Sequence, residues 1–315
     1  MALVSRIYFN AVFGALGGLL GWMLFGVFGD KNAPADQVTR QLLLGGALIG
    51  GAIGYFVVSV EAIRDRSLLR FVRLACYGVL LGVLGGAGGI LLGDWVNYLL
   101  VKGIGASRQG SVLHLLGTLF ARGLGWMFLG VTVGFSEGIA ARSLGKFSYG
   151  TLGGAIGGFL GGVLFGLALE KANTTGGQAS LWGAVGLIIL GACIGSLSAL
   201  VQSVFQPASV KVLRGWQEGR EYPLDKTDTL LGRDEHADIA LFRDMKVEKK
   251  HAIIQREGQR YLLRNNDAPS EWTRVNDRPV LQSCDLLDGD RIQLGNVLLR
   301  FQLRAAQERK RRGRV

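Results

Sequence analysis

The residues from Leu230 to His251, LLGRDEHADIALFRDMKVEKKH, contain the pattern that decides the fold of the C-terminal part of the chain. Alternating apolar residues stand on both sides of a Gly232-Arg233 pair and of a polar loop. Such alternation, interrupted by turn residues, predicts the hairpins of an antiparallel β-sandwich. Within the stretch, the order is the Gly-Arg pair, then Asp238-Ile239-Ala240-Leu241, and then His251.

Similar landmarks continue on both sides of this stretch, namely Val210–Gly215, Gly219–Leu224, Thr273–Asn276, Leu287–Gly295 and Leu298–Phe301. In this order and with this spacing, the landmarks resemble the forkhead-associated (FHA) domain over roughly residues 208 to 304. The resemblance implies an all-β sandwich whose loops at one end bind a phosphothreonine peptide.

Glycine and charge divide the chain into two parts near Gln206. Of 49 glycines, 7 follow Gln206; of 35 Lys and Arg, 22 follow it; and of 24 Asp and Glu, 17 follow it. The 315 residues suffice for two domains. We therefore predict a multidomain protein with a glycine-rich transmembrane domain at 1–206, an FHA-like sandwich at 207–304 and a basic tail at 305–315.

Apolar runs recur through the first part, and runs of about 20 residues are long enough to cross a bilayer as helices. They predict an α-helical membrane bundle with six spans, at approximately Ile7–Phe28, Gln41–Val60, Leu74–Leu92, Gly123–Ile139, Ser148–Leu169 and Leu181–Phe205. The fourth run is the weakest, because Arg122 stands at its start and His114 lies before it. The stretch from Ser111 to Ala121 is either an interfacial or re-entrant helix or an earlier beginning of this span, and a seventh span is an alternative.

Basic residues gather in the joints after the second and fourth runs, at Arg64, Arg66, Arg70, Arg73, Arg142 and Lys146. Positively charged loops mark the cytoplasmic side of a membrane protein. Together with Arg6 before the first span, these basic joints predict that both termini lie in the cytoplasm. We expect the protein to be integral to the inner (cytoplasmic) membrane of a bacterium. Three cysteines, Cys76, Cys193 and Cys284, form no disulfide framework, which suits a reduced cytoplasmic side.

The membrane part contains an internal repeat. The segments Glu61–Ser67 and Glu137–Ser143 share Glu, Ile, Arg and Ser at a constant offset, and each closes a pair of spans. We therefore expect three helical hairpins, of which the third, ending within Ser196–Phe205, is degenerate.

Glycine recurs at every fourth residue within the spans, most clearly at Gly150, Gly154, Gly158, Gly162 and Gly166, with a second row at Gly153, Gly157 and Gly161. This spacing places the small residues along one helical face. In lipid, such faces let helices approach closely, so the rows predict tight packing within one bundle or between copies of the chain. A pore or a substrate path lined by glycine backbone is the alternative.

Charged residues are almost absent from the middle of the spans, and Glu61, Glu137, Asp94 and Arg122 stand near span ends. That position favours interfacial anchoring or helix capping; alternatively, Glu61 and Glu137 are matched members of a pseudo-symmetric ion site. The sequence contains no nucleophile elbow, phosphate-cradling loop or zinc motif. We therefore predict no enzyme, no catalytic residue, no metal site and no cofactor.

The FHA resemblance implies roles for particular residues. Arg233 is a contact for phosphate or peptide, since a guanidinium group suits a phosphate. His251 braces the loops. The remaining candidates for binding a phosphopeptide or another partner are Lys249, Ser270, Thr273 and Asn276.

Two positions depart from the family pattern. Glu248 stands where the family has a serine that donates to the phosphate, and Glu271 stands where it has the peptide-binding asparagine. A carboxylate cannot donate and repels a phosphate dianion. Trp272, next to Glu271, is either an exposed anchor for a protein contact or is packed against the sandwich.

The two departures leave two functions open for the sandwich: recognition of phosphothreonine, or binding of an unphosphorylated partner or of the chain's own membrane part. We predict a membrane-tethered, non-catalytic adaptor that recruits a protein partner. The alternative is a transporter, channel or secretion-system component with a regulatory FHA-like domain. Membrane lipid and a second copy of the chain are further expected partners, and nucleic acid is disfavoured because no aromatic residues accompany the basic tail.

Overall fold

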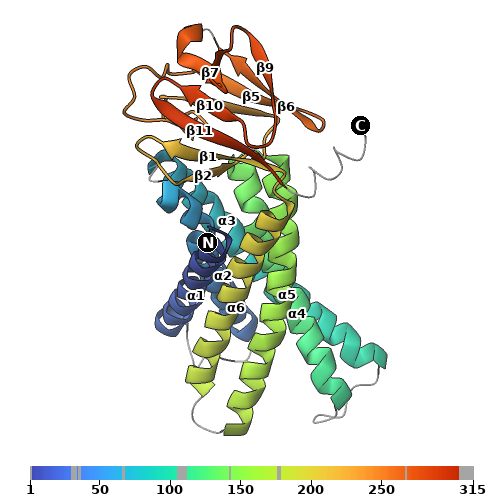
Figure 1. The fold of residues 1–315 in the computed structure, drawn as a ribbon. Helices are drawn as coiled ribbons and strands as arrows, with labels where there is room; N and C mark the ends of the chain where they lie inside the picture. The colour runs from blue at the N-terminus through green and yellow to red at the C-terminus, as the bar shows by residue number, and fades with distance from the viewer. Residues whose placement is uncertain are drawn as a thin grey trace. The chain divides into compact units, whose positions relative to one another are not determined.

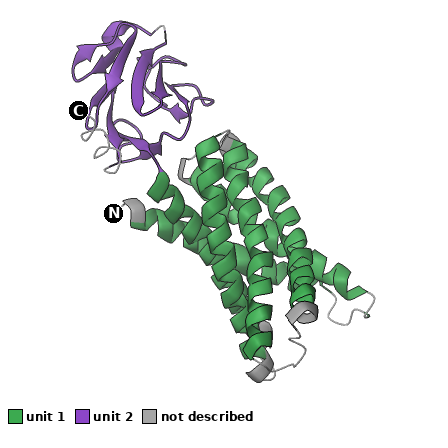
Figure 2. Cartoon of the chain, turned by 90° about the vertical axis from the view of Figure 1, so that its right-hand side faces the viewer, with its two compact units in different colours: residues 1–205 green, residues 206–315 purple. Residues whose placement is uncertain are grey.

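The structure is a computed structural model that describes residues 2–29, 34, 37–65, 68–104, 112–141, 143–175, 179–266 and 268–304. The chain forms two compact units, Met1–Phe205 and Gln206–Val315 (Figure 2). The basic tail predicted at 305–315 lies outside the described residues.

The first unit contains six long helices, α1 (Ala2–Phe28), α2 (Val38–Asp65), α3 (Leu68–Ile104), α4 (Val112–Ala141), α5 (Leu144–Thr175) and α6 (Ala179–Phe205) (Figure 1). By length and composition, all six could cross a membrane. The predicted six spans are confirmed in the described residues. The fourth span begins earlier than its apolar core, because α4 runs without a break from Val112 through His114 and Arg122.

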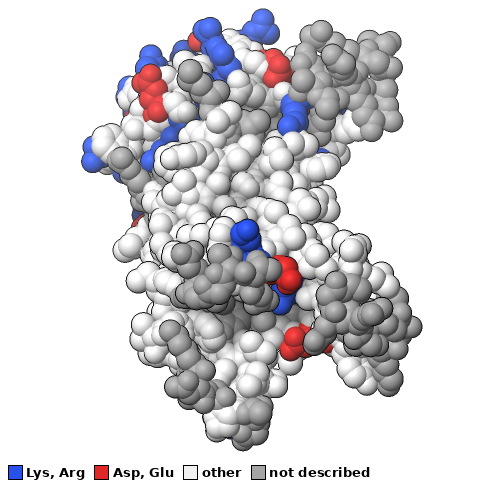
Figure 3. Space-filling view, turned by 90° about the horizontal axis from the view of Figure 1, so that it is seen from below, with Lys and Arg blue, Asp and Glu red and all other residues white. Residues whose placement is uncertain are grey.

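The six helices form a closed ring. Each helix packs against its neighbours in the chain, and α1 packs against α6. The helix α2 also contacts α4 and α6, so α2, α4 and α6 approach one another inside the ring. Figure 3, which views the molecule from below, shows broad uncharged areas of surface between a few groups of charged residues.

The glycine rows lie in the helix contacts. On α5, a methyl group added to Gly154 would overlap the carbonyl oxygen of Gly130 on α4, whereas one added to Gly157 would meet α6 at Cys193 and Ile194. The two rows of α5 therefore face two different neighbours. Such close backbone approach supports packing by dispersion forces in lipid, within one bundle as predicted.

The same glycine contact occurs at three places in the ring. Gly14 meets Gly191, Gly78 meets Gly54, and Gly154 meets Gly130. In each pair an odd-numbered helix meets an even-numbered helix of another hairpin. The predicted repeat of three helical hairpins stays a prediction, with which these contacts are compatible.

The second unit consists of short strands, β1 (Ala208–Arg214), β2 (Glu221–Pro223), β3 (Asp228–Gly232), β4 (Ile239–Ala240), β5 (Ala252–Glu257), β6 (Arg260–Asn265), β7 (Thr273–Val275), β8 (Arg278–Pro279), β9 (Ser283–Leu286), β10 (Arg291–Leu294) and β11 (Val297–Leu303). They form two sheets with the orders β2-β1-β11-β10-β7-β8 and β4-β3-β5-β6-β9. All pairings are antiparallel except that of β3 with β4.

Alternate residues of these strands point into one apolar core. In β11, for example, Val297, Leu299 and Phe301 are buried, and the ring of Phe301 packs 5.2 Å from that of Tyr261 on β6. The core belongs to this unit alone, and its residues come from both sheets. The predicted class, a helical membrane bundle followed by a β-sandwich, is thus confirmed.

Candidate functional site

Three loops meet at one end of the sandwich. The strands β3 and β6 both end there, and β5, which lies between them and runs antiparallel to both, begins there. The loops follow β3, β4 and β6. Between them lies a shallow depression of about 450 Å³, lined by Arg233, Asp234, Glu248, Lys249, Lys250 and Asn266. Two of the predicted binding residues, Arg233 and Lys249, therefore line one surface.

Backbone hydrogen bonds fix the position of Arg233. Its amide donates to the carbonyl oxygen of Glu248 (2.9 Å), and the amide of Asp234 donates to that of Lys249 (3.2 Å). The preceding Gly232 comes so close to Lys249 that an added methyl group would overlap the Lys249 carbonyl oxygen. The glycine of the Gly-Arg pair is therefore needed for the close approach of the two loops.

The half-buried side chain of Arg233 is only lightly engaged. Its Nη1 lies 2.9 Å from the Met245 sulfur, a weak acceptor, and its buried Nε has no hydrogen-bond partner. No carboxylate pairs with this guanidinium group among the described ion pairs. The group could exchange its contact with Met245 for a stronger acceptor on a ligand.

His251 joins two of the loops through a directed chain of hydrogen bonds. The amide of Glu248 donates to His251 Nδ1 (3.0 Å), so the proton of a neutral ring is on Nε2, which lies 3.0 Å from Thr273 Oγ1. The Thr273 hydroxyl in turn donates to Asn265 Oδ1 (3.3 Å). His251 is fully buried, and burial lowers the pKa of its ring, against the opposing charges of Glu248 and Asp244.

The other predicted binding residues occupy different places. Thr273 is fully buried beneath the loops, where it supports His251. Asn276 lies in the β7–β8 turn with φ 49°, and its side chain bonds Asp290 Oδ1 (2.8 Å) and the amide of Arg291 (3.0 Å). Ser270 begins a short 3₁₀ helix, η2 (Ser270–Trp272). None of the three lines the depression.

Of the two acidic residues that depart from the family pattern, only Glu248 lines the depression. Glu248 and Asp234 line the depression together with three basic residues, Arg233, Lys249 and Lys250. Glu271 lies exposed on η2. Trp272 next to it is half-buried, so it is neither fully exposed as an anchor for a partner nor fully packed against the sandwich. The surface therefore carries mixed charge rather than a purely basic one.

Sequence reasoning missed Asp234, Lys250 and Asn266 as lining residues. Asn266 ties two loops together, because its Nδ2 donates to the Lys250 carbonyl oxygen (2.9 Å) and its amide to that of His251 (3.0 Å). The available signal was the Asn265-Asn266 pair at the end of an apolar run, since asparagine often bonds nearby backbone at strand ends.

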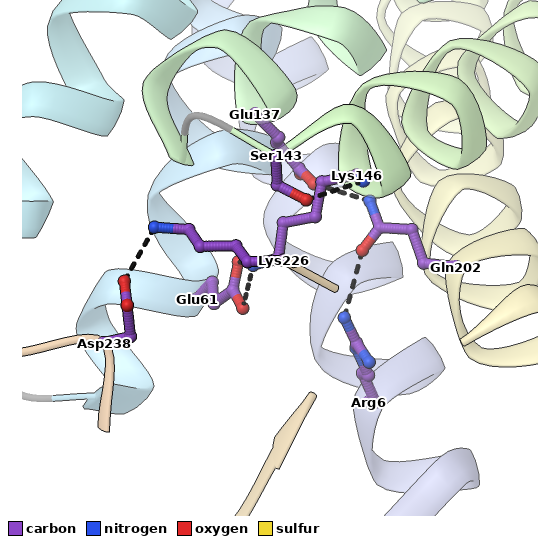
Figure 4. Close-up of polar contacts among 8 residues, drawn as sticks. All are labelled: Arg6, Glu61, Glu137, Ser143, Lys146, Gln202, Lys226 and Asp238. Atoms are coloured by element: carbon purple, nitrogen blue, oxygen red, sulfur yellow. Dashed lines mark hydrogen bonds and ion pairs between the residues drawn. The ribbon is translucent and has the colours of Figure 1, made fainter. Parts of the chain in front are cut away.

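Elsewhere in the unit, Lys226 Nζ pairs with Asp238 Oδ1 at 2.7 Å (Figure 4).

The membrane unit contains a second polar cluster, built from Arg6 on α1, Glu61 on α2, Glu137 on α4, Lys146 on α5 and Gln202 on α6 (Figure 4). Lys146 Nζ contacts both oxygens of Glu61 at 2.6 Å. Gln202 donates to Glu137 Oε2 (2.5 Å) and accepts from Arg6 (3.0 Å). Five helices thus bring the repeat-related Glu61 and Glu137 together.

Glu137 corrects one expectation. Its place near a span end favours an anchor at the membrane surface, but its side chain is buried inside the bundle. Arg122 on α4 lies close enough to two acidic residues, Glu170 on α5 and Asp94 on α3, to interact with both electrostatically. In the described residues, no group of three or more His, Cys, Asp or Glu is arranged to hold a metal ion.

Residues 211–305 match the family Yop-YscD_cpl, described as the cytoplasmic domain of an inner membrane component of T3SS. No curated protein matches the chain. Among solved structures, one from an analysis of phosphothreonine-dependent FHA domain interactions is 31% identical (TM-score 0.28) and aligns over 31% of this chain and 97% of that chain.

Two further FHA structures are similar. The FhaA FHA domain, complexed with the intracellular domain of Rv3910, is 32% identical over 30% of this chain and 99% of that chain (TM-score 0.27). The FHA domain of CT664 from Chlamydia trachomatis is 26% identical over 31% of this chain and 99% of that chain (TM-score 0.29). The chain is an FHA-domain protein with an N-terminal membrane domain.

Proposed function

We propose that the protein is a membrane-tethered, non-catalytic adaptor whose FHA-like domain recruits a protein partner at the depression around Arg233. The observation that carries this proposal is the lightly engaged Arg233 guanidinium group, which lines the depression with Lys249 on loops joined by hydrogen bonds. Rigid loops with an available guanidinium group favour binding, because little entropy is lost when a ligand arrives.

The charges of the depression favour a partner that carries both basic and acidic groups. Arg233, Lys249 and Lys250 can pair with acidic groups, whereas Glu248 and Asp234 can pair with basic ones. A phosphate dianion at Arg233 would lie near Glu248, which cannot donate to it. The adaptor therefore binds an unphosphorylated peptide segment better than a phosphothreonine.

The experiment is a pull-down from a cell lysate with the fragment Gln206–Val315, which contains a complete core of its own. Lysate treated with phosphatase is compared with untreated lysate, and Arg233→Ala is compared with the unchanged fragment. A partner that is retained after phosphatase treatment and lost with Arg233→Ala supports the proposal. Loss of the partner with phosphatase would restore phosphothreonine recognition.

A second candidate function is a structural component of a secretion system in the inner membrane. The match of residues 211–305 to the cytoplasmic domain of a T3SS inner membrane component favours it. If this function is correct, the full chain purified in mild detergent should elute as part of a large assembly. Cross-linking should then identify neighbouring proteins that contact both units. A chain that elutes alone or with one transient partner favours the adaptor.

A further inference from the structure

The interior of the membrane unit changes from apolar to polar toward one end. On α6, Leu190, Ile194, Ser198 and Gln202 follow one another at every fourth residue and so share one face. On α4, Leu129, Val133 and Glu137 do the same. Each inner helix thus carries buried apolar residues and, in its last turns, a polar side chain.

The cluster at this end has an exposed side and a buried side. The side chains of Glu61 and Lys146 are 30% and 12% exposed, whereas Glu137 is 7% exposed and Gln202 is 8% exposed. The pair Glu61–Lys146 is therefore the more exposed part of the cluster, and Glu137 and Gln202 are its buried part. Buried hydroxyls of Ser59 and Ser198 near this end have no hydrogen-bond partner, so the site has polar capacity beyond the bonds within the cluster.

Beyond the cluster the bundle is closed. Ile53, Leu129, Leu190 and Ile194 are fully buried and come from all three inner helices. Leu129 lies two helical turns from Glu137, a rise of about 12 Å. The Thr132 hydroxyl of α4 lies in that layer but donates to the Leu129 carbonyl oxygen of its own helix (2.8 Å). The described residues of these helices offer no charged side chain there, which disfavours passage of a proton or ion from Glu137 through the layer.

The charges that act on Glu137 come from several helices. Lys146 on α5 and Arg6 on α1 favour its ionised form, as does the hydrogen bond from Gln202 on α6. Glu61 on α2 has the same sign and disfavours it. Burial of a charged group also has a large cost, which the uptake of a proton removes.

We propose that Glu137 is a proton-binding site of the membrane domain, open only toward the end of the bundle where Glu61 and Lys146 lie. The proton comes from solvent and binds a carboxylate oxygen of Glu137, so the only change in the site is the gain of one positive charge. The bond from Gln202 then meets a neutral carboxyl group and weakens. Proton binding loosens the link that Gln202 makes between α4, α6 and Arg6 on α1.

The experiment is an infrared titration of the full chain in lipid nanodiscs. The carbonyl stretch of a protonated carboxyl group reports the site directly. We expect one such band to grow as the pH is lowered to about 6, a range in which exposed carboxylates stay ionised. This band should be lost in Glu137→Gln and retained in Glu61→Gln, the control at the repeat-related position. A band that persists in Glu137→Gln, or no titrating band at all, would overturn the proposal.

A second variant covers the case in which Glu137→Gln fails to fold. Gln202→Leu removes the donor to the ionised carboxylate, so the midpoint of the band should move to higher pH by about one unit. An unchanged or lowered midpoint contradicts the assignment.

Proteoliposomes with an enclosed pH indicator test whether the site is closed toward the other side of the membrane. We expect no proton flux above that of empty liposomes. A flux that depends on Glu137 would overturn the one-sided site.

Discussion

At the scale of single residues, we expect Glu248 and Glu271 to influence what the FHA-like domain binds. Glu248 lines the depression beside Arg233, and Glu271 lies on the neighbouring loop. We predict that the double change Glu248→Ser with Glu271→Asn raises the affinity for phosphothreonine peptides about tenfold or more. The reason is that one hydrogen bond to a charged group contributes about 1.5–3 kcal/mol, and repulsion is removed as well.

Calorimetric titration of the fragment Gln206–Val315 with a phosphothreonine peptide library measures this affinity. Glu257→Gln is the matched control, because it removes an exposed acidic group at the β5–β6 turn, away from the depression. Tight binding by the unchanged domain that depends on Arg233 would refute the prediction. If neither protein binds, the loops serve another ligand, and the half-buried Trp272 is the next residue to change.

His251 makes the stability of the sandwich depend on pH. Burial lowers the pKa of its ring, so the folded domain favours the neutral form, whereas the unfolded chain takes up a proton near about pH 6.5. The contribution of the neutral ring to stability is fully present above that pH and is lost as the pH falls through the folded pKa. We predict a falling free energy of unfolding between about pH 7 and pH 5.

Urea unfolding of the fragment at a series of pH values measures this slope. His236→Gln removes the exposed imidazole and should leave the slope unchanged, since that ring lies outside the buried network. If the pH dependence of stability disappears in His236→Gln, it arises from His236 and not from His251. Thr273→Val should lower stability by about 1–3 kcal/mol at neutral pH, because it removes the partner of the buried Nε2.

The sequence could predict Arg233 and His251, because a motif of fixed spacing carries them. It could not predict that Thr273 is a buried support or that Asn276 bonds Asp290, since both contacts join residues from different strands. Asn266 and Lys250 line the depression only because three loops converge there. Convergence of loops is a property of strand order, which a single sequence does not state.

At the scale of helices, the glycine rows determine which faces can meet. A methyl group added to Gly158 on α5 would overlap the carbonyl oxygen of Trp126 on α4, whereas one added to Gly183 on α6 meets nothing within 4 Å. We predict that Gly158→Ala lowers the thermal stability of the detergent-solubilised chain. Gly158→Leu should disrupt the bundle, because a longer side chain separates the backbones further.

Gly183→Ala is the matched control, and alanine should be neutral or stabilising there because it favours a helix over glycine by up to about 1 kcal/mol. The measurement is the midpoint of thermal aggregation followed by size-exclusion chromatography. Equal midpoints for Gly158→Ala and the unchanged chain would show that the face of Gly158 packs loosely or faces lipid.

The helix pattern explains why the polar cluster was only half-predictable. The constant offset between Glu61 and Glu137 identified them as equivalent positions. Whether equivalent positions meet depends on the order of helices in the ring, and the closing contact of α1 with α6 joins residues far apart in the chain. Gln202, which bonds both Glu137 and Arg6, belongs to the degenerate third hairpin and matched no motif.

At the scale of the whole molecule, composition alone separated the two units. The fall in glycine and the rise in charge near Gln206 coincide with the boundary between Phe205 and Gln206. Such a division was readable because a membrane unit and a water-soluble sandwich obey opposite rules of composition. The number of spans was readable for the same reason. The sequence left the beginning of the fourth helix open, because Arg122 and His114 interrupt the apolar pattern, and the structure places it at Val112.

An even number of spans has a consequence for topology. With six spanning helices, the N-terminus and the sandwich lie on the same side of the membrane. The basic joints at Arg73 and Lys146 predict that this side is the cytoplasm, because positively charged loops resist translocation. A reporter fused after Val315 should therefore be active only in its cytoplasmic form. A reporter inserted between α5 and α6 is the control and should be active only in its periplasmic form. Periplasmic activity after Val315 would place the depression around Arg233 outside the cell interior, beyond the reach of cytoplasmic partners, and would remove the basis of the adaptor.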